Sequence, residues 1–197
     1  FALIASGLFV TEFFLFPVAE LRGLFQVLPF MLCVFVPAVA MRLWAEERSS
    51  NTMEMLLTFP MHPMSLVLGK YLAGFCFLLL ALASTLLLPL MVTALGRPDF
   101  GQIASSYLGA ILLGGFFLAL GQLVSGFARD QIVAFVLSLL ACFGIFLLGT
   151  NFAATALDSW IGGLGTLLRE LLGVTGRYGV FARGIVEVAD LAFFLVW

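Results

Sequence analysis

The sequence carries little charge. Lys, Arg, Asp and Glu make up 10% of its 197 residues, whereas hydrophobic residues make up 63%. A soluble domain has about 25% charged residues and roughly 45–50% apolar residues, so this chain lacks the charge needed to cover a water-facing surface. The formal net charge is −2, which indicates neither nucleic acid nor anionic lipid as a partner.

Residues that commonly form catalytic or metal sites are also scarce. The single histidine, His62, lies in a polar loop, where a histidine is usually solvated. Cys33, Cys76 and Cys142 each lie inside an apolar run, and their odd number without a C-x-x-C pair does not favour a disulfide or metal framework. Neither H-E-x-x-H nor a complete phosphate-binding G-x-x-x-x-G-K-[ST] loop occurs. We therefore expect no catalytic, cofactor or metal site, and any ATP and magnesium would belong to another chain.

What the sequence has in abundance is long apolar runs. A helix that crosses the hydrocarbon core needs roughly 20 apolar residues, and a membrane-spanning β-barrel would instead show short alternating segments. The runs predict an all-α integral membrane protein with about six spans in a single domain. The expected spans are residues 1–18, 25–44, 64–95, 103–127, 132–148 and 184–197.

Several of these segments carry more specific signals. Pro29 and Pro37 predict kinks in the second span, and the third span is so long that it must tilt, project or bend near Pro89. Residues 167–172 are too short and charged to cross and predict an interfacial or re-entrant helix between spans five and six. Small residues allow close helix packing, so the fourth span is expected to lie inside the bundle. Its glycines are Gly109, Gly114, Gly115 and Gly121.

Orientation does not follow from the charges. The nine Lys and Arg residues divide four to five between the two sides of the membrane, which leaves the positive-inside rule undecided. The chain begins at Phe1 without a methionine and ends at Trp197 within an apolar run, so we expect both ends to be truncated. Glu12 is the clearest charge within a span; it would serve a proton path, lie near an interface or pair with a neighbouring subunit.

The most polar segment, between the second and third spans, carries a family resemblance. It reads MRLWAEER over 41–48 and TMEMLLTFP over 52–60, followed by LGKYLA over 68–73. This resembles the corresponding loop of type-2 ABC exporter permeases in the GldF-like, gliding-motility branch, roughly M-R-L-x-A-E-E-R-x-x-x-T-x-E-x-L-L-T-x-P and then L-G-K-[YF]. The similarity continues over residues 97–101, 106–109, 129–135 and 181–191.

Two positions depart from that pattern. Ser50-Asn51 stands where Ser-Gly commonly precedes the threonine, and residues 179–181 read Gly-Val-Phe where relatives often have a His-Phe pair. The first departure falls within the polar loop. The second changes the detail of the loop before the last span, and neither disturbs the resemblance.

The resemblance implies an assembly. Two copies of a six-helix permease, or two related permeases, would sit on two cytoplasmic ABC ATPase subunits, with an auxiliary membrane protein of GldG type as a possible further partner alongside membrane lipids. The complex would lie in the cytoplasmic or inner membrane of a bacterium or archaeon, with the 42–63 loop facing the cytoplasm. The residues expected to contact the ATPase are Arg42, Glu46, Glu47, Arg48, Thr52, Glu54, Arg129 and Asp130.

The same loop can be interpreted physically. Arg42 and Glu46 have the i,i+4 spacing of a helical ion pair, worth about 0.2–0.5 kcal/mol. Thr52 is expected to cap a short helix through Met55, although a neighbouring serine could do so too. Lys70, at the start of the third span, is expected to extend to the lipid headgroups. An ordinary solvated loop would carry the same charges.

Two functions from different classes are therefore consistent with the sequence. The first is an ATP-driven export permease. The second is a membrane anchor that transmits ATPase-driven movement to a partner without moving a solute. A third, an ATP-independent channel or ion carrier, is weakened by the scarcity of charge in the spans. The sequence does not indicate a substrate.

Overall fold

The computed structural model describes residues 1, 3–7, 22–52, 62–95, 99–159 and 162–196. Every long regular element in these ranges is an α-helix, which confirms the all-α prediction. The elements are α2 (Arg22–Ala40), α3 (Arg42–Ser49), α5 (Pro63–Thr85), α6 (Leu87–Leu95), α7 (Phe100–Phe127), α8 (Gln131–Leu148), α9 (Asn151–Asp158), α10 (Leu164–Leu172), α11 (Val174–Phe181) and α12 (Val188–Val196).

Among the described residues, four helical segments are long and apolar enough to cross a membrane. They are Gly23–Ser49, Pro63–Thr93, Phe100–Phe127 and Gln131–Leu148, and they correspond to the second to fifth expected spans. Most of the first expected span, and Glu12 within it, lies outside the described residues. The described part of the sixth is α12, which starts at Val188 rather than Gly184 because Gly184 adopts a left-handed φ of 89° and turns the chain there.

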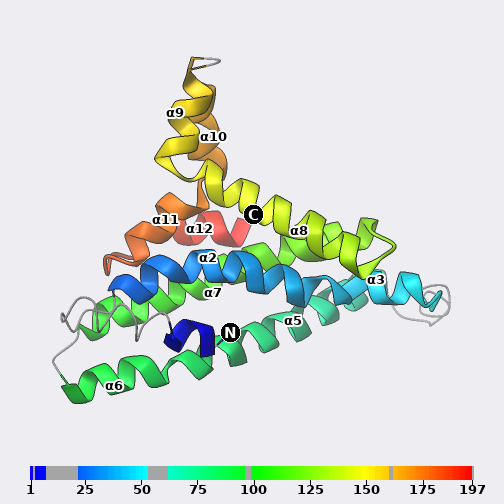
Figure 1. Cartoon of the computed structure of the whole chain (residues 1–197), viewed down its shortest axis with the longest axis horizontal. Helices are drawn as coiled ribbons and strands as arrows, with labels where there is room; N and C mark the ends of the chain where they lie inside the picture. The colour runs from blue at the N-terminus through cyan, green and yellow to red at the C-terminus, as the bar shows by residue number, and fades with distance from the viewer. Residues whose placement is uncertain (2, 8–21, 53–61, 96–98, 160–161, 197) are drawn as a thin grey trace.

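The third span bends where its sequence predicts. Pro89 has no amide hydrogen and its ring crowds the carbonyl of Thr85, four residues earlier. The helix accordingly breaks at Leu86, whose amide bonds to Ala83 three residues back instead of four. Figure 1 shows α6 continuing from the end of α5. By contrast, α2 continues as a helix through Pro29 and Pro37, the two positions where the sequence predicts kinks. The interruption that follows α2 lies at Met41.

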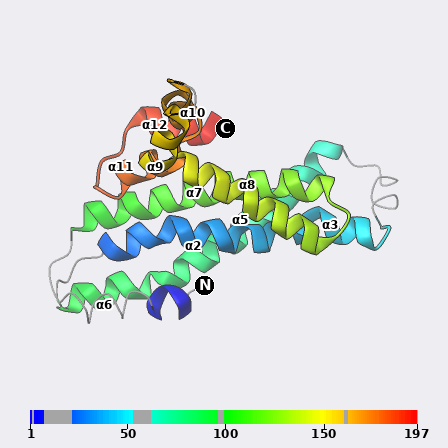
Figure 2. The same cartoon turned by 45° about the horizontal axis from the view of Figure 1, so that its top comes forward.

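The helix α7 lies at the centre of the bundle, as its glycines predict. It packs against α2, α3, α5, α8, α11 and α12 (Figure 2). A Cβ on each predicted glycine would meet a neighbouring helix. The distances from the added Cβ to the nearest atom are 2.8 Å at Gly109 (to Phe181 Cβ), 2.6 Å at Gly114 (to Leu78 Cδ2), 3.1 Å at Gly115 (to the Tyr71 hydroxyl) and 2.5 Å at Gly121 (to Ala40 Cβ). At Gly109 and Gly121 the added Cβ would meet another Cβ, so glycine is required there for the close packing that places α7 inside.

The helices α9 and α10 form a hairpin that projects from the bundle (Figure 1). The carboxylate of Asp158 accepts hydrogen bonds from the amides of Gly165 and Thr166 at 2.7 and 3.3 Å, which stabilises the start of α10. A Cβ on Gly165 would lie 2.1 Å from the Ala154 carbonyl oxygen, so the two helices meet backbone to backbone. With nine residues, α10 is too short to cross a bilayer, and its interfacial position stays a prediction.

Polar contacts also join α7 to the end of α11, and α11 to α12. Gln102 donates to the carbonyl of Ala182 at 2.9 Å, and the Ser105 hydroxyl lies 2.9 Å from the carbonyl of Phe181. Beyond them, Arg177 on α11 pairs with the buried carboxylate of Asp190 on α12 at 2.8 Å. The start of α7 is thus attached to the segment that leads into α12.

Candidate functional site

The helix α3 ends in a Schellman motif. Asn51 is the one described non-glycine residue with a positive φ, 55°, and its amide lies 3.4 Å from the carbonyl of Arg48. The amide of Thr52 bonds to the carbonyl of Glu47 at 3.1 Å. These are the two backbone bonds that close a helix through a left-handed residue, for which asparagine is the usual substitute for glycine. The Ser50-Asn51 departure therefore preserves the turn that Ser-Gly would make.

The start of α3 is fixed by a side chain of α7. The hydroxyl oxygen of Ser125 accepts hydrogen bonds from the amides of Trp44 and Ala45, both at 3.2 Å, and donates to the carbonyl of Met41 at 3.2 Å. It therefore lies where the helical bond from Ala45 to Met41 would otherwise run. A side chain inserted into the hydrogen-bond ladder is a known cause of helix bending, and it accounts for the interruption at Met41.

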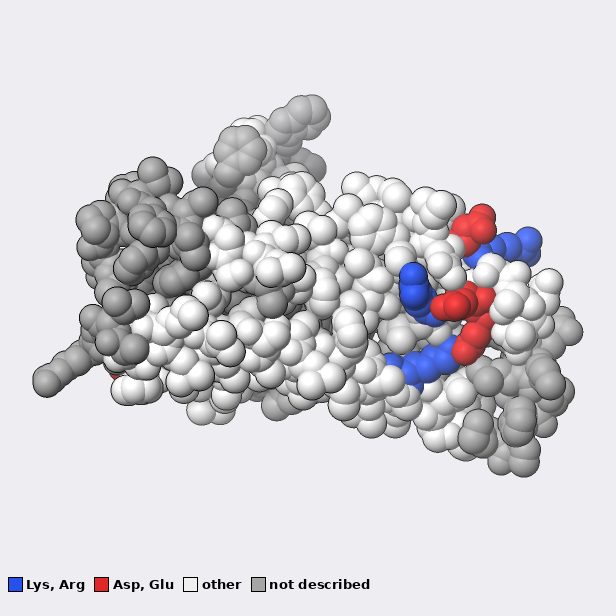
Figure 3. Space-filling model, turned by 60° about the horizontal axis from the view of Figure 1, so that its bottom comes forward, with Lys and Arg blue, Asp and Glu red and all other residues white. Residues whose placement is uncertain are grey.

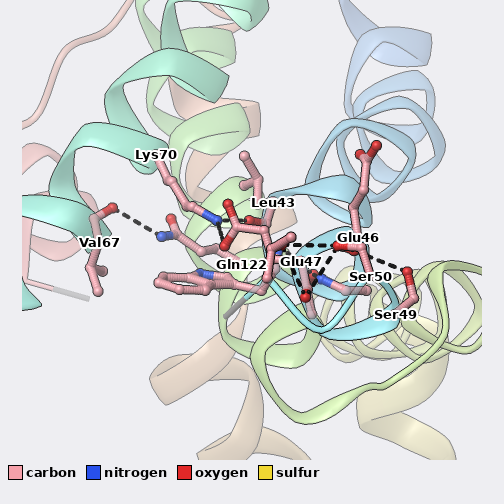
Figure 4. Close-up of polar contacts among 12 residues, drawn as sticks. Leu43, Glu46, Glu47, Ser49, Ser50, Val67, Lys70 and Gln122 are labelled. Carbon is pink, nitrogen blue, oxygen red and sulfur yellow. Dashed lines mark hydrogen bonds and ion pairs between the residues drawn. The ribbon is translucent and has the colours of Figure 1, made fainter. Parts of the chain in front are cut away.

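A cluster of polar groups fastens α3 to α5 (Figure 4). The Lys70 ammonium donates to the carbonyl of Leu43, forms an ion pair with Glu47 at 2.5 Å and lies 4.0 Å from the centre of the Trp44 ring. Both charged side chains are mostly buried, with 16% of Lys70 and 26% of Glu47 exposed. Three different contacts from one ammonium therefore hold the backbone and side chains of about one turn of α3 in place.

The helices α5 and α7 are joined in turn by two hydrogen bonds. The side-chain amide of Gln122, which is buried, donates to the carbonyl of Val67 at 3.0 Å (Figure 4). The Tyr71 hydroxyl donates to the carbonyl of Gly115 at 3.1 Å. These bonds link α5 to α7 beside the cluster around Lys70, so α3, α5 and α7 form one hydrogen-bonded unit.

The loop between α7 and α8 lies beside α3. Ala45, Ala128 and Ala134 form a small buried cluster with Met41 packed against it. Arg48 donates to the carbonyl of Phe127 at 3.3 Å. The two polar loops that the alternation of spans places on one side of the membrane therefore meet. Figure 3 shows charged side chains gathered at one end of the molecule, while the described surface alongside is almost entirely uncharged.

The structure brings together most of the predicted contact residues. Arg42, Glu46, Thr52, Arg129 and Asp130 are exposed, and Glu47 and Arg48 are partly buried against α5 and α7. Glu54 lies outside the described residues, as does the short helix expected after Thr52. Within the described residues the expected Arg42–Glu46 ion pair is not formed; the carboxylate that pairs is that of Glu47, because Lys70 lies on its side of α3.

Four residues at the junction were not predicted to have these roles. Lys70 was expected to reach the headgroups, but it turns to α3 instead, because a carboxylate, a carbonyl and an indole ring lie within its reach. No role was predicted for Trp44, Gln122 or Ser125. The available signal was the presence of a glutamine and a serine near the end of an apolar span, where polar side chains commonly join helices.

Comparison with known proteins decides the family. The family described as ABC-2 family transporter protein matches residues 18–168, more than half of the chain. The chain belongs to this family. No curated protein and no solved structure matches it.

As an ABC-2 family protein, the chain is the membrane component of an ABC transporter, which confirms the resemblance to type-2 ABC permeases. The four long apolar helices of the described residues and the family both indicate a membrane location. The family assigns ATP hydrolysis to a separate ABC ATPase subunit, with which this non-catalytic component pairs. The matched residues include α3, α5, α7 and the α7–α8 loop, so the junction described above lies inside the family domain.

Proposed function

We propose that this ABC-2 family chain is the permease subunit of an exporter of the GldF-like branch, driven through the segment Arg42–Thr52. The observation that carries the proposal is the attachment of α3 to the bundle. Ser125 holds its first turn, and Lys70 holds Glu47 at 2.5 Å in its middle. A segment attached in this way transmits displacement to α5 and α7, whereas a solvated loop would absorb it.

The two sides of α3 have separate roles in this proposal. Glu47 and Ala45 face the bundle and are engaged there, while Arg42 and Glu46 are exposed at the same end as Arg129 and Asp130. The exposed charges are free to meet an ATPase. Closure of the ATPase on nucleotide would then displace α3, and with it the helices to which it is bonded, which couples two distinct sites through a packed element.

The proposed assembly follows the family resemblance. Two permease chains, identical or related, stand on two ATPase subunits that bind ATP and magnesium. The Arg42–Thr52 end faces the cytoplasm, and the complex lies in the cytoplasmic or inner membrane of a bacterium or archaeon. An auxiliary membrane protein of GldG type joins it in this proposal.

Charge reversal at α3 tests the contact. We expect Glu46→Lys to reduce co-purification of the cognate ATPase and permease-stimulated ATP hydrolysis about tenfold, since like charges facing each other across an interface cost energy and lower the association rate. Glu170→Lys, an equally exposed reversal on α10, is the matched control and should leave both unchanged. Equal assembly and turnover in the Glu46 variant would contradict the proposed contact.

Sealed vesicles separate export from force transmission alone. ATP-dependent movement of a compound across the vesicle membrane by the permease–ATPase complex supports the exporter. Hydrolysis that depends on the intact α3 segment but moves no compound across the membrane supports the membrane anchor. A rate of ATP hydrolysis that is the same in the α3 variants as in the unmodified complex contradicts both.

A further inference from the structure

An open groove lies on the outer side of the junction, between α3, α5 and α7. It has a volume of about 510 Å³. Its walls include Val67 and Leu68 of α5 and Leu123 and Phe127 of α7, all of them exposed. Phe127 is 78% exposed and Leu123 is 60% exposed. An apolar groove of this size is within the range that holds a small ligand or part of a larger one.

The groove runs along the helix axes. Its α7 wall extends from Ala119 to Phe127, and eight residues of α-helix advance about 12 Å. Since α7 is one of the segments able to cross the membrane, the groove is parallel to the direction in which lipid chains lie. Its length fits a headgroup region followed by the upper part of one acyl chain.

The polar end of the groove is positively charged. Among the described residues Arg48 is the one charged residue that lines the groove, and none of their carboxylates pairs with it. The adjacent carboxylate of Glu47 is already engaged by Lys70 at 2.5 Å. Among the described residues Arg48 makes one side-chain hydrogen bond, to the carbonyl of Phe127 at 3.3 Å, so most of its five N–H donors have no partner there.

Aromatic residues line the groove close to Arg48. Trp44 lines the groove one turn before Arg48, and its ring is held beneath the Lys70 ammonium at 4.0 Å. Tryptophan and tyrosine gather where hydrocarbon meets headgroups, and Tyr71 lines the groove from α5. The groove thus combines a guanidinium that pairs with no described carboxylate, two aromatic residues of the kind found at membrane interfaces, and an apolar channel along the axis of α7.

We propose that this groove binds an anionic phospholipid, with the phosphate on Arg48 and one acyl chain between α5 and α7. Although the net charge of the whole chain is −2, recognition depends on the local charge, which at this groove is positive. The proposal separates Arg48 from the exposed charges of α3: Glu46 faces a protein partner, and Arg48 faces lipid. It does not depend on the direction of transport or on the identity of the ATPase.

Native mass spectrometry of the full chain in mild detergent tests the proposal. The protein is titrated with phosphatidylglycerol and with phosphatidylcholine of identical acyl chains. We expect one phosphatidylglycerol to bind about fivefold more tightly, the gain from one basic residue facing one anionic headgroup. Arg48→Gln should abolish the preference. Arg183→Gln, an exposed arginine outside the groove, removes the same charge and should preserve it.

A second variant tests the apolar channel without changing charge. Gly126 lines the groove, and a Cβ placed on it would meet no atom within 4 Å, so Gly126→Leu fills the groove without disturbing the helix packing. It should lower binding of both lipids at this position. Gly144→Leu, at an equally open glycine outside the groove, should not.

Four results would overturn the proposal. Equal binding of the two lipids by the unmodified chain would show that Arg48 does not distinguish their headgroups. An unchanged preference for phosphatidylglycerol in Arg48→Gln would show that the anion binds elsewhere. Full displacement of phosphatidylglycerol by millimolar inorganic phosphate would show an anion site without a lipid channel. A groove filled instead by a co-purifying protein, with no lipid retained, would make it a protein interface.

Discussion

The hydroxyl oxygen of Ser125 on α7 lies 3.2 Å from the amide nitrogen of Ala45 on α3, eighty positions away in the sequence. The same oxygen donates to the carbonyl of Met41 at 3.2 Å. One small side chain thus replaces a backbone hydrogen bond of the helix it contacts. The interruption between α2 and α3 at Met41 is therefore determined by α7 and not only by the residues next to it.

Removal of this hydroxyl should loosen α3. We expect Ser125→Ala to lower the free energy of unfolding by about 1–2 kcal/mol, because buried backbone groups lose their partner and only part of the loss is recovered by a straighter helix. Thermal unfolding in detergent measures the change. Ser84→Ala, at an exposed serine of α5, is the control, and an equal effect of the two substitutions would contradict the role of Ser125.

The Lys70–Glu47 pair should show a favourable coupling energy. Because both side chains are mostly buried but remain in reach of water, we expect about 1 kcal/mol between Lys70→Gln and Glu47→Gln in a double-mutant cycle of unfolding. The single variants should each be destabilising. Additive effects in the double variant would show that the two side chains do not interact.

Close packing at Gly121 should make alanine costly there. A Cβ at Gly121 would lie 2.5 Å from the Ala40 Cβ, so α2 and α7 must move apart, and we expect Gly121→Ala to destabilise by about 1–3 kcal/mol. Gly144→Ala, where the added Cβ meets nothing within 4 Å, should be neutral or stabilising. Adding Ala40→Gly should restore the stability of the Gly121 variant; if it does not, the clash is not the cause.

The ion pair between α11 and α12 should contribute more than a surface pair. Asp190 is 5% exposed and Arg177 also stacks on the Phe193 ring at 4.2 Å. We expect Asp190→Asn to cost about 2 kcal/mol of unfolding free energy, less than for a fully buried pair because Arg177 keeps partial access to water. Glu187→Gln, at an exposed carboxylate nearby, is the control. Equal midpoints for the two variants would contradict the assignment.

Asn51 offers a prediction about backbone conformation. With φ at 55°, it tolerates glycine, so Asn51→Gly should change stability by less than about 0.5 kcal/mol, whereas Asn51→Val should cost about 1–2 kcal/mol because a β-branched residue resists the left-handed region. Hydrogen exchange of the Thr52 amide measures the effect locally. Similar exchange in the glycine and valine variants would show that the Schellman turn is not required.

The sequence predicted those features of the fold that depend on local composition. Apolar length predicted the long helices found at the second to fifth expected spans, Pro89 predicted the break in the third, and four glycines placed α7 inside the bundle. Each of these follows from a property of the residue itself. The position of the last helix was less well predicted, because Gly184 reads as part of an apolar run until its left-handed turn is seen.

The junction could be predicted only in part. The segment that carries it was found through its charged residues, yet the residues that hold it, Ser125 and Lys70, act through partners distant in sequence. The Arg42–Glu46 spacing suits an ion pair within α3. That spacing does not show that Lys70, on another helix, pairs with Glu47 instead. Ion pairs between helices depend on how the helices pack, and the pattern of residues along one helix does not show this.

The two ends of α7 are bonded to opposite extremes of the molecule. Ser125 holds α3 at one end, and twenty residues earlier Ser105 meets the end of α11. The helix between them is continuous, and the two serines lie about 30 Å apart along it. If α7 tilts about its middle, its ends swing in opposite directions at the same moment. Widening at one membrane surface and narrowing at the other would then be one motion, with no need for two separately timed gates.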